Sequence, residues 1–151
     1  QLWPALDALQ ALDCQGVTRI DNALTQFMAN AHQPGVVIIL SDLLGDVLPE
    51  PVLKTLAARG HDVVVVQVLA EDDIEPVLDG PLRLVDSESG EVLIVTVDNA
   101  IRSAYLDRLT ARLETLETEC ARTGVEYVRA TTAVPFEDVV LRYLRQGRAF
   151  A

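Results

Sequence analysis

The sequence has no hydrophobic run long enough to cross a membrane. Its longest apolar stretches, Gly35–Leu40 and Val63–Ala70, are far shorter than the roughly 18 residues that a membrane-spanning helix needs. No basic start precedes an apolar stretch, so we expect no secretion signal. Aromatic residues make up only 5% of the 151 residues, yet half of the chain is apolar. Aliphatic side chains must therefore build the core, and the length suits one domain.

Cysteine and nucleotide-binding motifs are also scarce. Cys14 and Cys120 form no CxxC pair and have no Cys/His spacing suited to zinc, and so few cysteines agree with a reducing compartment. Cys120 falls on the apolar stripe of a predicted helix and is expected to be a small core residue. The chain contains neither GxGxxG nor GxxxxGK[ST], which argues against nucleotide binding.

Positive charge is in short supply. Against 23 Asp and Glu the chain has 12 Lys and Arg, so its net charge is −11. We expect no nucleic-acid partner, because a phosphate backbone would be repelled and no basic stripe with aromatics is present. The acidity is concentrated in residues 42–98, with 13 acids and 3 bases, a net −10. This segment could attract a cation or a basic partner surface, or simply form a solvated acidic face.

The hydrophobic periodicity predicts alternating helices and strands. Aliphatic runs rich in β-branched residues predict core strands at Val36–Leu40, Val63–Leu69 and Val125–Arg129. A β-hairpin is predicted from two runs, 82–86 and 91–97, around a Ser/Gly-containing turn. Helices are predicted at 2–13, at 18–32, from Pro49 or Pro51 to Gly60, at 99–123 ended by Gly124, and from Pro135 onward. Apolar residues line up on one face of these helices, among them Leu6 and Leu9 in the first and Ile101 and Tyr105 in the fourth, and Phe136 is expected to point inward in the last. Residues 71–80 have no period and are predicted to be a loop.

These elements define the fold class. A strand, a helix and a second strand at this spacing form a βαβ unit with parallel strands and a right-handed crossover. The sequence therefore predicts an α/β protein with an open, mostly parallel sheet, helices on both faces and an inserted hairpin. Two helices precede the first strand, whereas a doubly wound sheet normally opens with a strand. We therefore interpret residues 1–151 as one domain that is the later part of a larger sheet.

Asp42 is the strongest candidate for a residue that binds a ligand or takes part in a reaction. It directly follows a buried strand, which places it at the carboxyl end of the sheet, where open α/β folds bind ligands. A carboxylate there can bind a hard cation such as Mg²⁺ or accept a phosphoryl group, or it can cap a backbone N–H in the loop. Thr18 could ligate the same cation, although with Asp21 it also resembles a capping pair at a helix start.

Other polar residues fit no motif. Asp72, Asp73 and Glu75 share one loop but lack the spacing of an EF-hand, so a solvated loop is expected. Neither His32 nor His61 has a Ser or Cys placed beside it by any motif, so a nucleophilic triad has no support.

The ordered segments GVVIILSDLLGD, LAARGHDVVVVQVL, LVDSESGEV, GVEYVRA and YLRQGR are similar to the carboxyl-terminal part of the domain-of-unknown-function family 58, whose core is a von Willebrand factor A-like domain. The resemblance implies a metal-ion-dependent adhesion site. Thr18, between the first two predicted helices, matches the threonine ligand of that site, and Asp42 matches its later aspartate. The Asp-x-Ser-x-Ser strand of the family has no counterpart in this chain. The resemblance thus implies Mg²⁺ in the full-length domain and no tightly bound metal here.

The resemblance further implies a protein-interaction module and not an enzyme, often acting beside MoxR-type AAA ATPases at the cytoplasmic face. No membrane contact is expected from this segment. Strand 36–40 would lack its neighbour, so its apolar edge predicts a homodimer. Two alternatives stay open: a phosphoryl-transfer domain with Asp42 as acceptor, and a metal-free structural dimerisation module. The phosphoryl-transfer alternative would need more acids and a lysine near Asp42, and the only lysine is Lys54.

Overall fold

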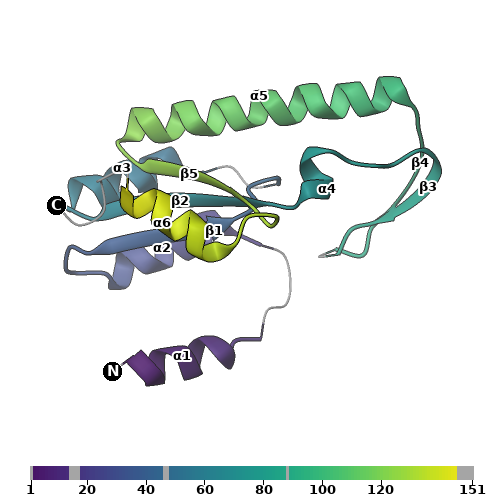
Figure 1. Cartoon of the computed structure of the whole chain (residues 1–151). Coiled ribbons are helices and arrows are strands. Elements are labelled where there is room, and N and C mark those ends of the chain that lie inside the picture. The colour runs from purple at the N-terminus through teal and green to yellow at the C-terminus, as the bar shows by residue number, and fades with distance from the viewer. Residues whose placement is uncertain (1, 14–17, 46–47, 88, 146–151) are drawn as a thin grey trace.

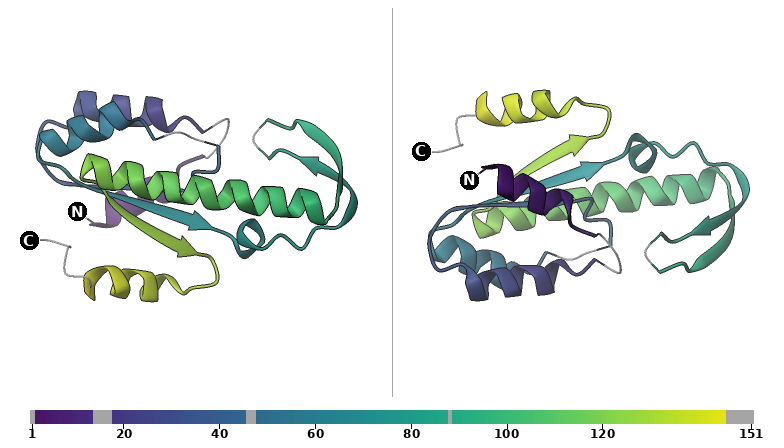
Figure 2. Two further views of the ribbon diagram at one scale, coloured as in Figure 1. Left: turned by 90° about the horizontal axis from the view of Figure 1, so that it is seen from above. Right: turned by 90° about the horizontal axis from the view of Figure 1, so that it is seen from below.

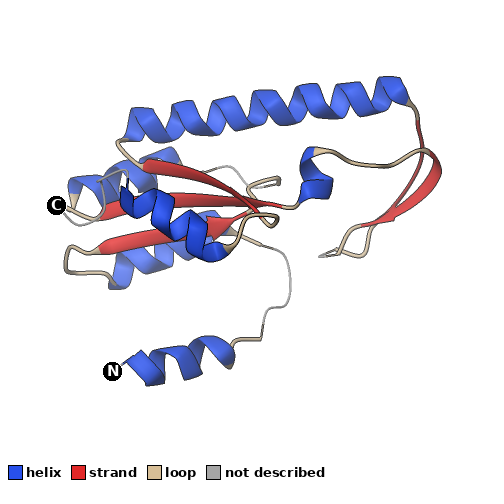
Figure 3. Cartoon of the chain, in the orientation of Figure 1, coloured by secondary structure: helices blue, strands red, loops and turns tan. Residues whose placement is uncertain are grey.

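A computed structural model describes residues 2–13, 18–45, 48–87 and 89–145 of the chain. Figure 1 labels the helices and strands, and Figure 3 colours them by type. The six helices and five strands of the described residues are, in chain order, α1 (Leu2–Gln10), α2 (Ile20–Asn30), β1 (Val36–Ser41), α3 (Glu50–Ala58), β2 (Asp62–Leu69), α4 (Glu71–Ile74), β3 (Gly80–Val85), β4 (Val92–Val97), α5 (Asn99–Thr123), β5 (Glu126–Thr131) and α6 (Phe136–Arg145).

The strands form two separate sheets. The core sheet has the order β1-β2-β5 and is parallel throughout, with Val37 opposite Val63 and Val65 opposite Tyr127. The second sheet is the antiparallel pair of β3 and β4. The predicted fold class is confirmed: a parallel α/β sheet is flanked by helices and carries an inserted hairpin (Figure 3).

One face of the core sheet carries the hydrophobic core. Because side chains alternate along a strand, the register places Val37 and Ile39 on the same face as Val63 and Val65. The helices α2, α3 and α5 cover this face, and Figure 2 shows α5 lying across the sheet. The core cluster consists of Ile20, Leu24, Val37, Ile39, Leu43, Leu48, Leu53, Leu56, Val63, Val65, Leu116, Cys120 and Val125.

The other face of β1 is open. Ile38 is 59% exposed and Leu40 is 69% exposed, and among the described residues β1 pairs only with β2. The helix α1 lies apart from the sheet on this side (Figure 1), and its Trp3, Leu6 and Leu9 are also exposed. The apolar face predicted for residues 2–13 therefore is not buried in the core.

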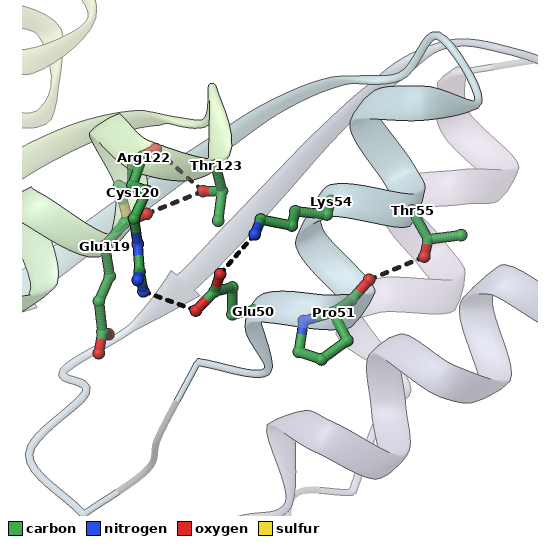
Figure 4. A network of polar contacts seen from close by, with 8 residues as sticks. All are labelled: Glu50, Pro51, Lys54, Thr55, Glu119, Cys120, Arg122 and Thr123. Carbon is green, nitrogen blue, oxygen red and sulfur yellow. Dashed lines mark hydrogen bonds and ion pairs between the residues drawn. The ribbon is translucent and has the colours of Figure 1, made fainter.

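A polar clamp joins the helices that cover the core. Glu50, in the first turn of α3, contacts Lys54 Nζ one turn later and Arg122 Nη2 at the end of α5, each at 2.6 Å (Figure 4). The nearby Thr123 hydroxyl donates hydrogen bonds to the Cys120 and Glu119 carbonyls. The lysine and the arginine hold the pKa of Glu50 below its ordinary value, the hydrogen bond from Lys54 being the largest cause.

Four expectations need correction. Helix α2 begins at Ile20 with Arg19 as its N-cap and no side-chain cap, so Thr18 is not the capping residue. Residues 71–74 form one helical turn, α4, because Asp73 Oδ2 accepts a hydrogen bond from the Ala70 N–H at 2.8 Å. Ile101 and Tyr105 are partly exposed because the first half of α5 extends beyond the core sheet (Figure 2). Phe136, expected to point inward, is 76% exposed.

Candidate functional site

The carboxyl edge of the core sheet is the candidate site. Strands β1, β2 and β5 are parallel, so all three end at this edge. Asp42 follows the last residue of β1 directly, and its side chain is exposed. The residue predicted from the sequence therefore lies at the edge where open α/β sheets bind ligands.

The turn after β1 is tightly specified. The Leu43 N–H donates to Ser41 Oγ at 3.1 Å, and the Leu44 N–H donates to Asp42 Oδ1 at 3.2 Å. Leu43 has a φ of +54°, a left-handed conformation that a bulky residue rarely adopts, and its side chain is fully buried in the core. That conformation costs roughly 1–2 kcal/mol, whereas burying a leucine contributes about 1.5–3 kcal/mol, so burial holds the turn.

Asp42 therefore does what the capping alternative predicted, since Oδ1 accepts a backbone N–H within the loop. This contact leaves its role as a ligand open. An ionised carboxylate has about four acceptor positions on two oxygens, so an exposed Asp with one such hydrogen bond can also bind a cation. The hydrogen bond orients the carboxylate.

A buried glutamine supports the turn from below. Gln67, in β2, is fully buried, and its Nε2 donates a 2.6 Å hydrogen bond to the Asp42 carbonyl. Its Oε1 accepts a hydrogen bond from the Tyr127 hydroxyl in β5. Arg129 lies over the Tyr127 ring at 5.8 Å and reaches Glu117 of α5 at 4.0 Å. Polar contacts thus connect all three core strands just beneath Asp42.

The sequence does not predict a functional role for Gln67. It lies in the predicted strand Val63–Leu69, where it is the one polar residue. A polar side chain in a continuous buried strand must find hydrogen-bond partners, because an unsatisfied buried amide is costly. That signal could have marked Gln67 as a residue that organises the strand ends.

Thr18 lies two residues before α2 and is exposed. The helix α2 begins at the end of the sheet where β1 finishes and runs back toward the start of β1 (Figure 1). Thr18 and Asp42 therefore belong to the same end of the sheet. Threonine and aspartate oxygens are of the kind that Mg²⁺ takes as ligands, in a near-octahedral shell of about six. Among the described residues, no three His, Cys, Asp or Glu side chains gather as a metal-binding group.

The remaining candidates have structural roles or stand alone. Cys120 is fully buried in the core, as predicted, and burial raises the pKa of its thiol to about 11. Cys14 lies outside the described residues. Lys54 Nζ contacts Glu50, and His61 is buried edge-on against the Phe27 ring with centroids 5.9 Å apart. No helix within the described ranges combines the length and apolar character needed to cross a membrane.

The fold and its carboxyl edge define an α/β protein with a three-stranded parallel core. The chain belongs to the protein family of unknown function DUF58, whose model matches residues 5–115. It is 37% identical over 71 residues to uncharacterized protein Rv1480 of Mycobacterium tuberculosis and, to the same extent, to uncharacterized protein Mb1516 of Mycobacterium bovis. Each match covers 47% of this chain and 22% of the relative, so the chain spans about a fifth of their length.

A third relative, uncharacterized protein MAV169 of Mycobacterium avium, is 25% identical over 114 residues, which are 76% of this chain and 67% of that protein. No solved structure matches the chain.

Proposed function

We propose that this chain is a protein-interaction module of a DUF58 protein and that a partner docks at the carboxyl edge of its core sheet. The observation that carries the proposal is the exposed carboxylate of Asp42 on a turn fixed by Ser41, Leu43 and Gln67. A rigid, exposed acid at this edge is preorganised for a ligand. The similarity to von Willebrand A-like domains supports reading this edge as the docking edge.

The docking depends on Mg²⁺ in this proposal. Asp42 and Thr18 supply two oxygens, directly or through water, and water and a partner carboxylate supply others. When bound, the ion links the negative edge of this chain to an acidic group of the partner. The donors of this chain alone are few, so Mg²⁺ binds weakly to it without the partner.

The partner class follows from the same resemblance. MoxR-type AAA ATPases accompany similar domains, and we propose such an ATPase as the partner, at the cytoplasmic face. The alternative role of Asp42 as a phosphoryl acceptor gains no support, because the only lysine of the chain contacts Glu50. Such a lysine would have to steady the phosphate.

Binding of a purified MoxR-type ATPase to the immobilised chain, in Mg²⁺ and in EDTA, tests the proposal. We expect Mg²⁺-dependent binding that weakens at least about tenfold (1.4 kcal/mol) in Asp42→Asn. Asp62→Asn is the matched control, because Asp62 is exposed at the opposite, amino end of β2. If neither EDTA nor Asp42→Asn changes the binding affinity, the proposal of a Mg²⁺-dependent site is wrong.

A further inference from the structure

The β3–β4 hairpin, residues 80–97, extends away from the core sheet (Figure 2), and we call it the hairpin arm. Its base is attached to the body. Val97 is buried, and Arg102 of α5 donates a hydrogen bond to the Leu78 carbonyl just before β3. The turn is ordered by Asp86, which accepts hydrogen bonds from the N–H and the hydroxyl of Ser89. The arm is thus a defined ribbon with an exposed distal half.

Apolar side chains cover both faces of that distal half. The cross-strand pair Val85 and Val92 shares one face with Ile94, which is 80% exposed and lies opposite Arg83, and the pair Leu84 and Leu93 lies on the other face. A solvated antiparallel ribbon normally carries polar residues on its outer face. Two-stranded hairpins are also marginally stable alone. An arm that is apolar on both faces is typical of a segment that another surface covers.

The charge around the arm indicates the chemistry of the surface that would cover it. Residues 71–98 contain nine acids and one arginine, a net −8 in a chain of net −11. Glu75, Asp79 and Glu91 are exposed and form no ion pair within the described residues. Two arms side by side would place like charges together, and an anionic membrane or a nucleic acid would be repelled.

We propose that the hairpin arm is a second docking surface, which inserts into an apolar groove of a partner protein bordered by lysine and arginine side chains. The apolar faces of the arm supply the contact area. The acidic residues of segment 71–98 favour a partner with a basic rim and accelerate its association with the arm. This surface uses neither Asp42 nor a metal, so it works in EDTA. It gives the acidic middle of the chain a role separate from the carboxyl edge of the sheet.

A labelled short peptide of alternating Val and Lys is the probe, and its binding to the whole chain is followed by fluorescence anisotropy in EDTA. Peptides of alternating Val and Glu, and of alternating Ser and Lys, are the comparisons. We expect the Val/Lys peptide to bind at least about tenfold tighter than either comparison. Its affinity should fall as NaCl is raised to about 0.3 M.

Two double variants, one within the arm and one in the acidic residues on and before it, locate the binding. Val92→Thr with Ile94→Thr keeps β-propensity and removes apolar surface, and should weaken binding about tenfold. Glu75→Gln with Glu91→Gln should weaken it and flatten its salt dependence. Ile38→Thr, on the exposed face of β1, is the control and should bind as the parent does. Equal binding of the Ser/Lys peptide, loss of binding in Ile38→Thr alone, or an arm-dependent dimer in sedimentation would each overturn the proposal.

Discussion

The side-chain amide of Gln67 donates a 2.6 Å hydrogen bond to the backbone carbonyl of Asp42, 25 residues earlier in the chain. The bond fixes the end of β1 to the buried interior of β2. It means that the exposed Asp42 carboxylate is placed by a residue that never reaches the surface. The position of Asp42 therefore depends on the packing of the core.

Replacing this glutamine tests that dependence. Gln67→Leu has similar volume but leaves the Asp42 carbonyl and the Tyr127 hydroxyl without their partner. We expect the free energy of unfolding to fall by about 1–3 kcal/mol, measured by urea denaturation. Gln26→Leu, at an exposed position of α2, should stay within about 0.5 kcal/mol of the parent. Equal stability of Gln67→Leu and the parent would show that the hydrogen bonds are not needed.

The clamp at Glu50 predicts a pH-dependent contribution to stability. Because its ion pairs lower the pKa of Glu50, they stabilise the fold above the ordinary pKa of 4.5, and that stability is lost as the pH falls through the lower folded value. Glu50→Gln should therefore be less stable than the parent at neutral pH, with the gap closing in acid and in high salt. Thermal unfolding across this pH range measures it, with the exposed Glu114→Gln as the control. A gap that persists in acid would contradict the ionic explanation.

The Cys120 thiol should be unreactive in the folded protein. In a Cys14→Ser background, its burial and raised pKa of about 11 predict very slow reaction with a thiol reagent at neutral pH and fast reaction in urea. Since the folded pKa exceeds the ordinary 9.0, stability should also decline as the pH rises from 9 to about 11. Fast labelling without denaturant would show that the end of α5 opens.

The open edge of β1 predicts self-association. Its backbone groups pair with β2 on one side only within the described residues, and Val36, Ile38 and Leu40 are exposed beside them. We expect a dimer at micromolar concentration in sedimentation velocity, because such an edge is a template for strand pairing. Ile38→Lys should give monomers, and Phe136→Lys, at a more exposed apolar residue away from this edge, should not. A monomeric parent chain would refute this prediction.

The sequence predicted the elements whose ends carry explicit signals. Helix α5 runs from Asn99 to Thr123 as predicted, because Asp98 caps its start by accepting the Ile101 N–H and Gly124 ends it at a φ of +74°. Strands β1 and β2 were equally clear from their β-branched residues. Helix α4 was missed because one turn is too short to show a period.

The candidate site was predicted only in part. The position of Asp42 follows from the strand before it, but the contacts that hold it come from Gln67 and Tyr127, which are distant in sequence. No local sequence pattern predicts the left-handed backbone at Leu43, because the turn is imposed by burial of the leucine side chain and not by a glycine. Tertiary contacts of this kind override local preference.

The left-handed Leu43 also makes the orientation of Asp42 depend on the integrity of the core. Burial of the Leu43 side chain offsets the strain of its backbone, so a molecule with a loosened interior would lose the turn that orients Asp42. If a partner docks at this edge as we propose, recognition would then select well-folded copies of the protein over damaged ones.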